Sequence, residues 1–413
     1  MWGMLIFAWF ALASVNIISF GLGMMMPGII SEFGVDPAAI GQVVGFASWV
    51  QVLSLIPLSI LLARRNPRYT VPLIMIGMVA GFTVVGMAQT LTMFYVGYIL
   101  FAPFSANLVA TLLVGAKLRG VPPQQMVQVN GIENFAQPTG QVAALLLIPV
   151  LVGAFGTWRS VFATVAIAVA VGLIVYFFIW GDGKRINYGQ TETPPPDNAP
   201  KTSPFAALKE AASSRVVWLT GLAWPGTTIV WIAMFLYWPT YAITTLGVPL
   251  AHAGTVLAMI PLFSAVASLV APTIAKKVGY DKPFICSWGL LLPIFYFMMT
   301  VVTSLPLLFM FSAMAGFGAY FFVPLAFTNV YKIGLSKAAV SISTGIILTF
   351  VLVGVAIAGN VVGGLTRAVG VQNALRIACL TPLWFGALTL FLPELGYKKM
   401  MALQAASEKG KAS

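Results

Sequence analysis

The chain has 413 residues, of which 60% are hydrophobic and only 8% are charged. Soluble domains carry about a quarter charged residues, so this composition excludes an ordinary soluble protein and indicates an all-α membrane protein. The formal net charge of +12 could suggest a nucleic acid partner, but the basic residues lie in the short stretches between apolar segments. We therefore expect no nucleic acid partner and contact with membrane lipid instead.

Twelve apolar segments follow one another along the chain, and a helix needs about 20 such residues to cross the hydrocarbon layer. The first begins almost at Met1 without a basic leader, so we interpret it as a retained span. The segments cover residues 4–27, 40–62, 70–89, 93–116, 127–153, 160–180, 216–243, 253–275, 283–303, 306–330, 339–364 and 372–393.

The lysines and arginines are distributed asymmetrically about this predicted membrane. Of the 22 basic residues, only Arg159, Arg367 and Arg376 fall on one side. By the positive-inside rule, the side with the other basic residues is cytoplasmic, and an even number of spans places both termini there. We expect a multi-pass protein of the bacterial inner (plasma) membrane.

One long polar segment divides the chain. Residues 181–213, "GDGKRINYGQTETPPPDNAPKTSPFAALKEAAS", predict a cytoplasmic linker that ends in a short amphipathic helix at about 204–213. On either side lie an N-terminal six-helix bundle (1–180) and a C-terminal six-helix bundle (214–395), followed by a cytoplasmic tail (396–413). The turn "ARRNPRY" recurs as "AKKVGYDK" about 213 residues later, and internal repeats of this kind are typical of secondary transporters.

These features together resemble the major facilitator superfamily over almost the whole chain. The family's signature turn is Gly-x-x-x-Asp-Arg-x-Gly followed by basic residues. In "SILLARRNPRY", Ser59 and Asn66 replace the two glycines and Ala63 replaces the Asp. Arg64 keeps the Arg, and Arg68 keeps a later basic position. In "PTIAKKVGYDK" the acidic, basic and glycine positions are occupied by Lys276, Lys277 and Gly279. Because both acidic positions are lost, the resemblance implies that the cytoplasmic latch of the family is weaker here or is built differently.

A polar stripe marks the fifth apolar segment. Asn130, Glu133, Asn134, Gln137 and Gln141 lie three or four residues apart, so they share one face of a helix, which should face the bundle interior or a water-filled cavity. Glu133 is the only acidic residue that this interpretation places inside a span.

Three roles stay open for Glu133. It could carry a proton, with Asn134 and Arg64 taking part in coupling or gating, because burial disfavours the charged carboxylate. It could contact the solute directly. It could also form a structural ion pair with Arg64, Arg119 or Lys117.

If solute binds near the midplane, polar or aromatic residues at the centres of the spans are candidate contacts. For any one of them, a hydrogen bond between helices is an equally good interpretation. The candidates are Asn16, Gln51, Asn107, Gln137, Gln141, Trp231, Tyr237, Ser264, Tyr320 and Thr349, with Asn360 a weaker choice.

The seventh segment carries an aromatic face that could bind solute or simply pack. Its large rings recur at helical spacing, at Trp224, Trp231, Phe235 and Trp238. We expect Pro225, Gly226 and Pro239 to interrupt this helix. Such breaks in transporters often accompany gating or binding segments. We interpret His252 as a loop residue, with a pH-sensitive external gate as the alternative, and Cys286 and Cys379 as buried free thiols without metal-ligand spacing.

The sequence therefore predicts a secondary active transporter, working by symport or antiport, for a small neutral, zwitterionic or cationic organic solute. Protons are a candidate coupling ion through Glu133, and no cofactor is expected. A transporter of a small organic anion, by uniport or exchange, and a non-transporting sensor or assembly protein on the same fold are the alternatives. One histidine and no paired carboxylates within the spans argue against an enzyme, and we expect a monomer.

Overall fold

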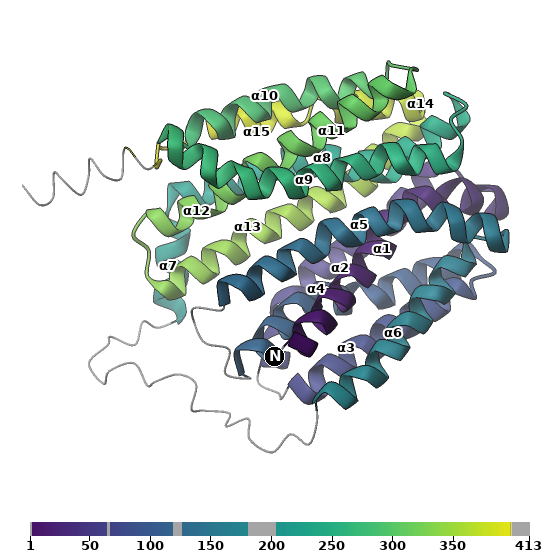
Figure 1. Cartoon of the computed structure of the whole chain (residues 1–413), viewed down its shortest axis with the longest axis horizontal. Helices are drawn as coiled ribbons and strands as arrows, with labels where there is room; N and C mark the ends of the chain where they lie inside the picture. The colour runs from purple at the N-terminus through teal and green to yellow at the C-terminus, as the bar shows by residue number, and fades with distance from the viewer. Residues whose placement is uncertain (1, 64–66, 119–125, 181–203, 397, 399–413) are drawn as a thin grey trace, which may run out of the picture. The chain divides into compact units, whose positions relative to one another are not determined.

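A computed structural model describes residues 2–63, 67–118, 126–180, 204–396 and 398, and the described chain is helical (Figure 1). The first six helices match the first six predicted segments, with ends that differ by up to six residues. They are α1 (Trp2–Phe33), α2 (Pro37–Ala63), α3 (Pro67–Gly86), α4 (Leu91–Leu118), α5 (Met126–Phe155) and α6 (Arg159–Trp180).

The second part of the chain is more broken. The predicted amphipathic helix is present as α7 (Pro204–Ser213), and the apolar segments then form shorter pieces. These are α8 (Arg215–Thr244), α9 (Leu250–Val278), α10 (Lys282–Met298), α11 (Leu305–Phe321), α12 (Val323–Lys332), α13 (Lys337–Ile357), the π-helical turn η2 (Ala358–Val362), α14 (Gly363–Ala378) and α15 (Pro382–Thr389).

Within the described residues, ten stretches are long and apolar enough to cross a membrane, against the twelve segments expected. One difference is α10, which is apolar but only 17 residues long. The other is the stretch Ile342–Thr389, which takes in the last two predicted segments without a clear loop between them. The backbone turns inside that stretch at Gly370, whose φ of 80° is in the region that favours glycine.

The predicted interruption of the seventh segment is wrong. The helix α8 runs unbroken from Arg215 to Thr244 through both prolines. Prolines are tolerated in membrane helices when neighbouring side chains satisfy the backbone groups they free. Near Pro225 the carbonyl of Leu222 accepts a hydrogen bond from Trp384 Nε1 at 2.8 Å, and that of Gly226 accepts one from Thr381 Oγ1 at 2.7 Å.

The described helices pack as two compact units, which we describe separately. Unit 1 comprises residues 1–200 together with 235–258 and 359–371, and unit 2 comprises residues 201–234, 259–358 and 372–413. Unit 1 therefore combines the first part of the sequence with the last part of α8 and the first parts of α9 and α14. The division into two six-helix bundles at the 181–213 linker stays a prediction.

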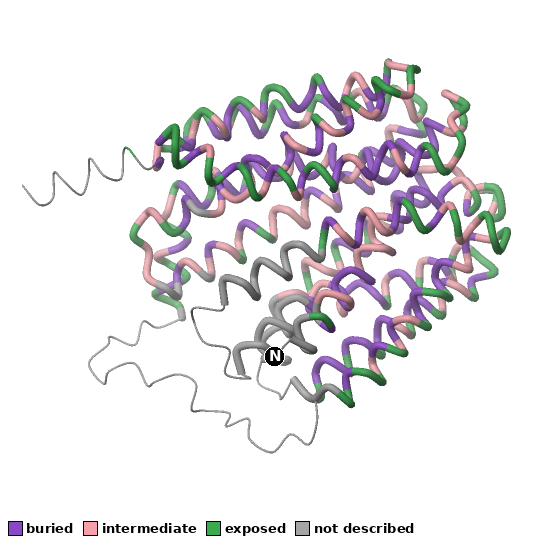
Figure 2. Tube along the Cα trace, viewed as in Figure 1, coloured by how far each residue is buried: buried purple, intermediate pink, exposed green. Residues whose placement is uncertain are grey.

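Packing inside the units relies on close helix approach. In unit 1, α1 packs against α5, and α3 packs against both α4 and α6, and Figure 2 shows buried and exposed stretches alternating along these helices. A Cβ added at Gly81 of α3 would lie 3.0 Å from the carbonyl oxygen of Gly97 on α4. Small residues at such crossings are the usual device for packing helices within membranes. In unit 2, α10 packs against α11 and α15, and α7 packs against α13.

Candidate functional site

Three predicted polar positions of unit 1 are bonded within the helix bundle. Gln51 on α2 donates from Nε2 to Ser105 Oγ on α4 at 3.0 Å. Asn107 is fully buried and donates to the carbonyl of Pro103 at 2.9 Å, and Asn16 donates to the carbonyl of Leu12 at 2.8 Å. The last two bonds lie within their own helices, so they leave each amide oxygen to other partners.

Gln141 differs from these amides. Its side chain is 1% exposed, and its Nε2 has no hydrogen-bond partner in the part of the chain that the structure describes. One turn earlier on the same face of α5, Gln137 is exposed. The polar stripe therefore passes from an exposed position into the packed interior. Leaving a buried amide N–H unsatisfied costs on the order of 1–3 kcal/mol, so such a group calls for a ligand, a water or a second conformation that satisfies it.

Glu133 and Asn134 belong to α5, but their side chains, like that of Asn130, lie outside the described part of the structure, and Arg64 lies outside it altogether. The three roles considered for Glu133 therefore stay predictions.

In unit 2 the structure brings together two of the predicted residues. The rings of Trp231 on α8 and Tyr320 on α11 lie with centroids 5.2 Å apart at an interplanar angle of 48°. Ser264 instead donates to the carbonyls of Ile260 and Gly316, at 2.7 and 2.9 Å, which ties α9 to α11. Thr349 donates to the carbonyl of Gly345 in its own helix at 2.9 Å.

The aromatic face predicted on α8 is buried. Trp224, Trp231, Phe235 and Trp238 are all less than 8% exposed, which agrees with packing between helices. Tyr237 is also fully buried, and its hydroxyl donates to the carbonyl of Gly359 at 3.1 Å. Within this face, Trp231 is the residue whose ring lies beside another candidate solute contact, Tyr320.

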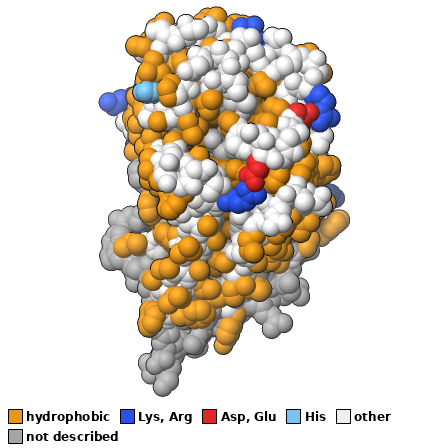
Figure 3. All heavy atoms as spheres, turned by 90° about the vertical axis from the view of Figure 1, so that its right-hand side faces the viewer, with side chains coloured by type: hydrophobic (Ala, Val, Ile, Leu, Met, Phe, Trp, Pro, Cys, Tyr) orange, Lys and Arg blue, Asp and Glu red, His pale blue; other side chains and the backbone are white. Residues whose placement is uncertain are grey.

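Two ion pairs lie on the side that the sequence predicts to be extracytoplasmic. Glu32 pairs with Arg159 at 2.5 Å and accepts a hydrogen bond from Trp158 Nε1 at 2.7 Å. Asp36 pairs with Arg367 at 2.6 Å. Figure 3, which views the right-hand side of Figure 1, shows acidic groups lying against basic ones on a surface with few charges.

Sequence analysis identified these arginines but not their partners. It ended the first span at residue 27, whereas α1 continues to Phe33 and Glu32 falls inside the candidate span Trp9–Phe33. The expectation that Glu133 is the only acidic residue in a span is therefore wrong. The sequence contains a signal that could have suggested these partners, because the two acids Glu32 and Asp36 lie shortly after the predicted end of the first segment.

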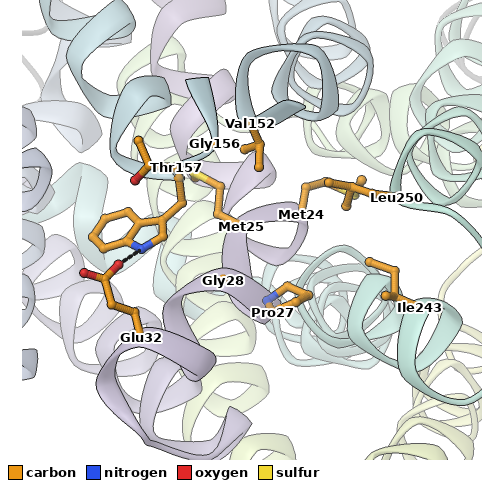
Figure 4. Close-up of a pocket in the computed structure, with 11 residues that line it drawn as sticks. Met24, Met25, Pro27, Gly28, Glu32, Val152, Gly156, Thr157, Ile243 and Leu250 are labelled. Carbon is orange, nitrogen blue, oxygen red and sulfur yellow. Dashed lines mark hydrogen bonds between the residues drawn. The ribbon is translucent and has the colours of Figure 1, made fainter. Parts of the chain in front are cut away.

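A cavity of about 270 Å³ lies beside the first ion pair (Figure 4). Its wall is mostly apolar, and the Glu32 carboxylate that enters it already accepts the Trp158 hydrogen bond drawn in the figure. The lining comes from α1, from the end of α5 and the turn after it, and from the α8–α9 region: Met24, Met25, Pro27, Gly28, Glu32, Val152, Gly156, Thr157, Trp158, Ile243 and Leu250.

At the basic turn after α9, residues outside the signature positions form an ion pair and two hydrogen bonds. Asp281, which is 4% exposed, pairs with Lys332 at the end of α12. The carboxylate of Glu394 accepts the backbone N–H groups of Asp281 and Lys282, at 2.9 and 3.2 Å. At this turn, then, an acid five residues beyond Lys276 joins the start of α10 to the end of α12.

The free cysteines are as expected, since Cys286 and Cys379 are both buried and unbridged. His252 is exposed at the start of α9, rather than in a loop. Among the described residues no group of three or more His, Cys, Asp or Glu side chains could hold a metal ion.

Comparisons with known proteins agree with this architecture. The family model described as Major Facilitator Superfamily matches residues 8–359. No curated protein sequence matches the chain.

Solved structures match over nearly the full length. A bacterial homolog of the human lysosomal transporter Spinster, in an inward-facing and unoccupied conformation, superposes with a TM-score of 0.74 at 17% identity, with 94% of each chain covered. The same protein in an occupied conformation gives 0.68 at 17% identity, with 93% of each chain covered. A mutant of the nucleoside transporter NupG gives 0.75 at 12% identity, covering 94% of this chain and 98% of that one. At these identities the matches show the shared fold.

Proposed function

This chain belongs to the major facilitator superfamily of secondary transporters, and from that premise we propose that it moves a small neutral, zwitterionic or cationic organic solute by alternating access. As a family member it is a multi-pass membrane transporter and not an enzyme. The solute class, the coupling ion and the solute contacts are the proposed part.

The placement of charge supports this solute class. In the described spanning helices, every basic residue lies within a few residues of a helix end or of the kink at Gly370. A site for a strongly anionic solute would need a basic partner at the depth where the solute binds, because an unpaired charge there is costly. The candidate contacts at that depth are amides and aromatic rings, which suit hydrogen-bonding groups and apolar or cationic surfaces.

The observation that carries the proposal is the unsatisfied amide of Gln141. A donor that is buried and without a partner is suited to an acceptor on the solute, such as a carbonyl, hydroxyl or ring nitrogen. Its position on the same face as the exposed Gln137 offers a polar route toward it. Within unit 2, the Trp231–Tyr320 pair is a separate candidate for an apolar contact. A nucleoside, the solute named for one protein of the same fold, has both kinds of surface.

The experiment begins with a thermal-shift screen of the purified protein against metabolites, since a bound solute stabilises the folded state by mass action. Flux of each hit is then measured in reconstituted vesicles. We expect Gln141→Leu to weaken binding of the solute by about tenfold, the loss of one hydrogen bond to a buried group. Thr83→Val on α3 is the matched control, because its hydroxyl is exposed, is bonded within its own helix and belongs to no candidate solute contact. Equal binding in the parent and in Gln141→Leu would remove the proposed contact, and absence of any flux would remove the function.

We also propose proton coupling through Glu133. The support is its place on the polar stripe of α5, one turn before Gln137. The pH dependence of solute affinity should be present in the parent and absent in Glu133→Gln. The same pH dependence in both proteins would exclude proton coupling through Glu133 and leave the structural ion pair and the direct solute contact as its roles.

A further inference from the structure

The π-helical turn η2 interrupts the long helical stretch that begins with α13. It spans Ala358–Val362, and the chain passes from unit 2 into unit 1 at Gly359 within it. A π turn holds one residue more than the α-helix around it, and such turns often occur at functional sites. Here the Gly359 carbonyl accepts its hydrogen bond from the hydroxyl of Tyr237 on α8.

Glycines let α2 press directly on this turn. A Cβ at Gly41 of α2 would lie 1.9 Å from the Tyr237 hydroxyl and 2.6 Å from the Gly359 carbonyl oxygen. A Cβ at Gly45 would lie 2.4 Å from the amide of Asn360. We call this set of contacts, all inside unit 1, the α2–η2 contact. It has no room for even one methyl group, so the two backbones must separate whenever the turn changes shape.

The ion pair between Asp36 and Arg367 depends on the same turn. Asp36 directly precedes α2, and Arg367 follows the last residue of η2 by five positions. Removing one residue from a helix rotates everything after it by about 100° and shifts it by about 1.5 Å. If the π turn were replaced by α-helix, Arg367 would therefore turn away from Asp36.

We propose that η2 is a register switch for a gate on the side of the membrane opposite the basic loops. In the π-helical register the Tyr237 hydroxyl holds Gly359, and Arg367 faces Asp36, so the α2–η2 contact is closed. Conversion to the α-helical register breaks both interactions together and opens that side. This inference rests on the proposed transport function, because it describes how one of the two accesses is closed.

The test follows exposure of one cysteine. Ala38 on α2 is fully buried, and its carbonyl lies 3.4 Å from where a Cβ of Gly363 would be. The Ala38→Cys variant of the full chain is purified in detergent, and the rate of its reaction with a maleimide is measured. The parent protein, whose two cysteines are both buried, supplies the background rate.

Tyr237→Phe removes the hydroxyl and keeps the ring. Loss of one net hydrogen bond should raise the labelling rate of Ala38→Cys by about two- to tenfold. Deletion of Val361, an exposed residue of η2, removes the extra residue and should raise the rate further. Val361→Ala is its matched control, because it removes the side chain and keeps the register, so it should label like the starting variant.

The decisive measurement is whether the Asp36–Arg367 ion pair depends on the π-helical register of η2. If one switch controls both, Asp36→Asn should raise the labelling rate in the parent background and have no effect once Val361 is deleted. Equal effects of Asp36→Asn in both backgrounds, or unchanged labelling in Tyr237→Phe, would overturn the proposal. Labelling needs no solute, so a protein that shows no flux but labels as expected would contradict the transport proposal while leaving the switch intact.

Discussion

Gly23 on α1 provides the sharpest test of how tightly unit 1 is packed. A Cβ at this position would lie 2.0 Å from the carbonyl oxygen of Phe235 and 2.9 Å from Cα of Leu236, both on α8. Ordinary van der Waals contact begins at about 3.4 Å, so the methyl carbon of Gly23→Ala would lie about 1.4 Å too close to the Phe235 oxygen. The three nearest atoms all belong to the backbone, so a rotamer change cannot relieve the clash with them. Overpacking of this kind costs about 1–3 kcal/mol or more.

A transporter can avoid part of that cost. If the end of α8 separates from α1 when the protein changes conformation, Gly23→Ala should shift the population toward the separated state before it unfolds the chain. A bias of 1.4 kcal/mol corresponds to about a tenfold change in the ratio of the two states. We therefore expect the Ala38→Cys labelling rate to rise by tenfold or more, with a fall of a few degrees in apparent Tm.

Gly364→Ala is the matched control for this substitution. Gly364 is also helical, but a Cβ there would meet nothing within 4 Å. Alanine is favoured over glycine in a helix interior by about 0.5–1 kcal/mol, so the control should be neutral or slightly stabilising. If Gly23→Ala and Gly364→Ala gave the same Tm and the same labelling rate, the close approach of α1 to α8 would not exist in the protein.

Three other predictions concern charged groups. Lys332→Met leaves Asp281 buried without its partner, so it should destabilise the protein by up to about 3 kcal/mol and lower the apparent Tm, and adding Asp281→Asn should recover part of the loss. Glu210→Gln weakens the acceptor that binds Ser336 N and Oγ at 2.8 and 2.6 Å, so amide hydrogen exchange of α7 should speed up while that of α3 stays unchanged. The arginine beside Asp36 lowers the pKa of that carboxyl below its ordinary 3.8, so the ion pair is present above that value and is lost only as the pH falls further. The difference in apparent Tm between the parent and Asp36→Asn should therefore stay constant between pH 5 and 8, and a difference that changed with pH in this range would contradict the assignment.

Local patterns in the sequence were enough to predict much of the fold. The first six apolar segments and the short helix Pro204–Ser213 were found because length, hydropathy and helical periodicity are properties of neighbouring residues. The breaks in the second part were not found. A π turn at 358–362 adds one residue without changing composition, and Gly370 is one of many glycines in apolar segments.

The candidate site was harder to predict because its contacts join distant parts of the chain. Arg159 and Glu32 are 127 residues apart, and Arg367 and Asp36 are 331 residues apart. Periodicity could suggest that Gln141 faces inward, but not that its amide nitrogen lacks a partner. The continuity of α8 was missed for the same reason, since the side chains that bond to its carbonyls beside Pro225 are Thr381 and Trp384, about 160 residues later.

The ion pairs of Glu32 and Asp36 reduce the number of acidic residues that could bind and release a coupled proton. Asp36 is held ionised by its arginine partner, so it does not exchange a proton between pH 5 and 8. The carboxylate of Glu32 is occupied by an arginine and an indole N–H, so a proton would have to displace a bonded partner there. Neither acid therefore has the properties of a carrier that must gain and lose its proton in each cycle. A proton-coupled cycle in this chain would have to use another group, and Glu133 is the acid that the sequence places beside the candidate solute contacts on α5.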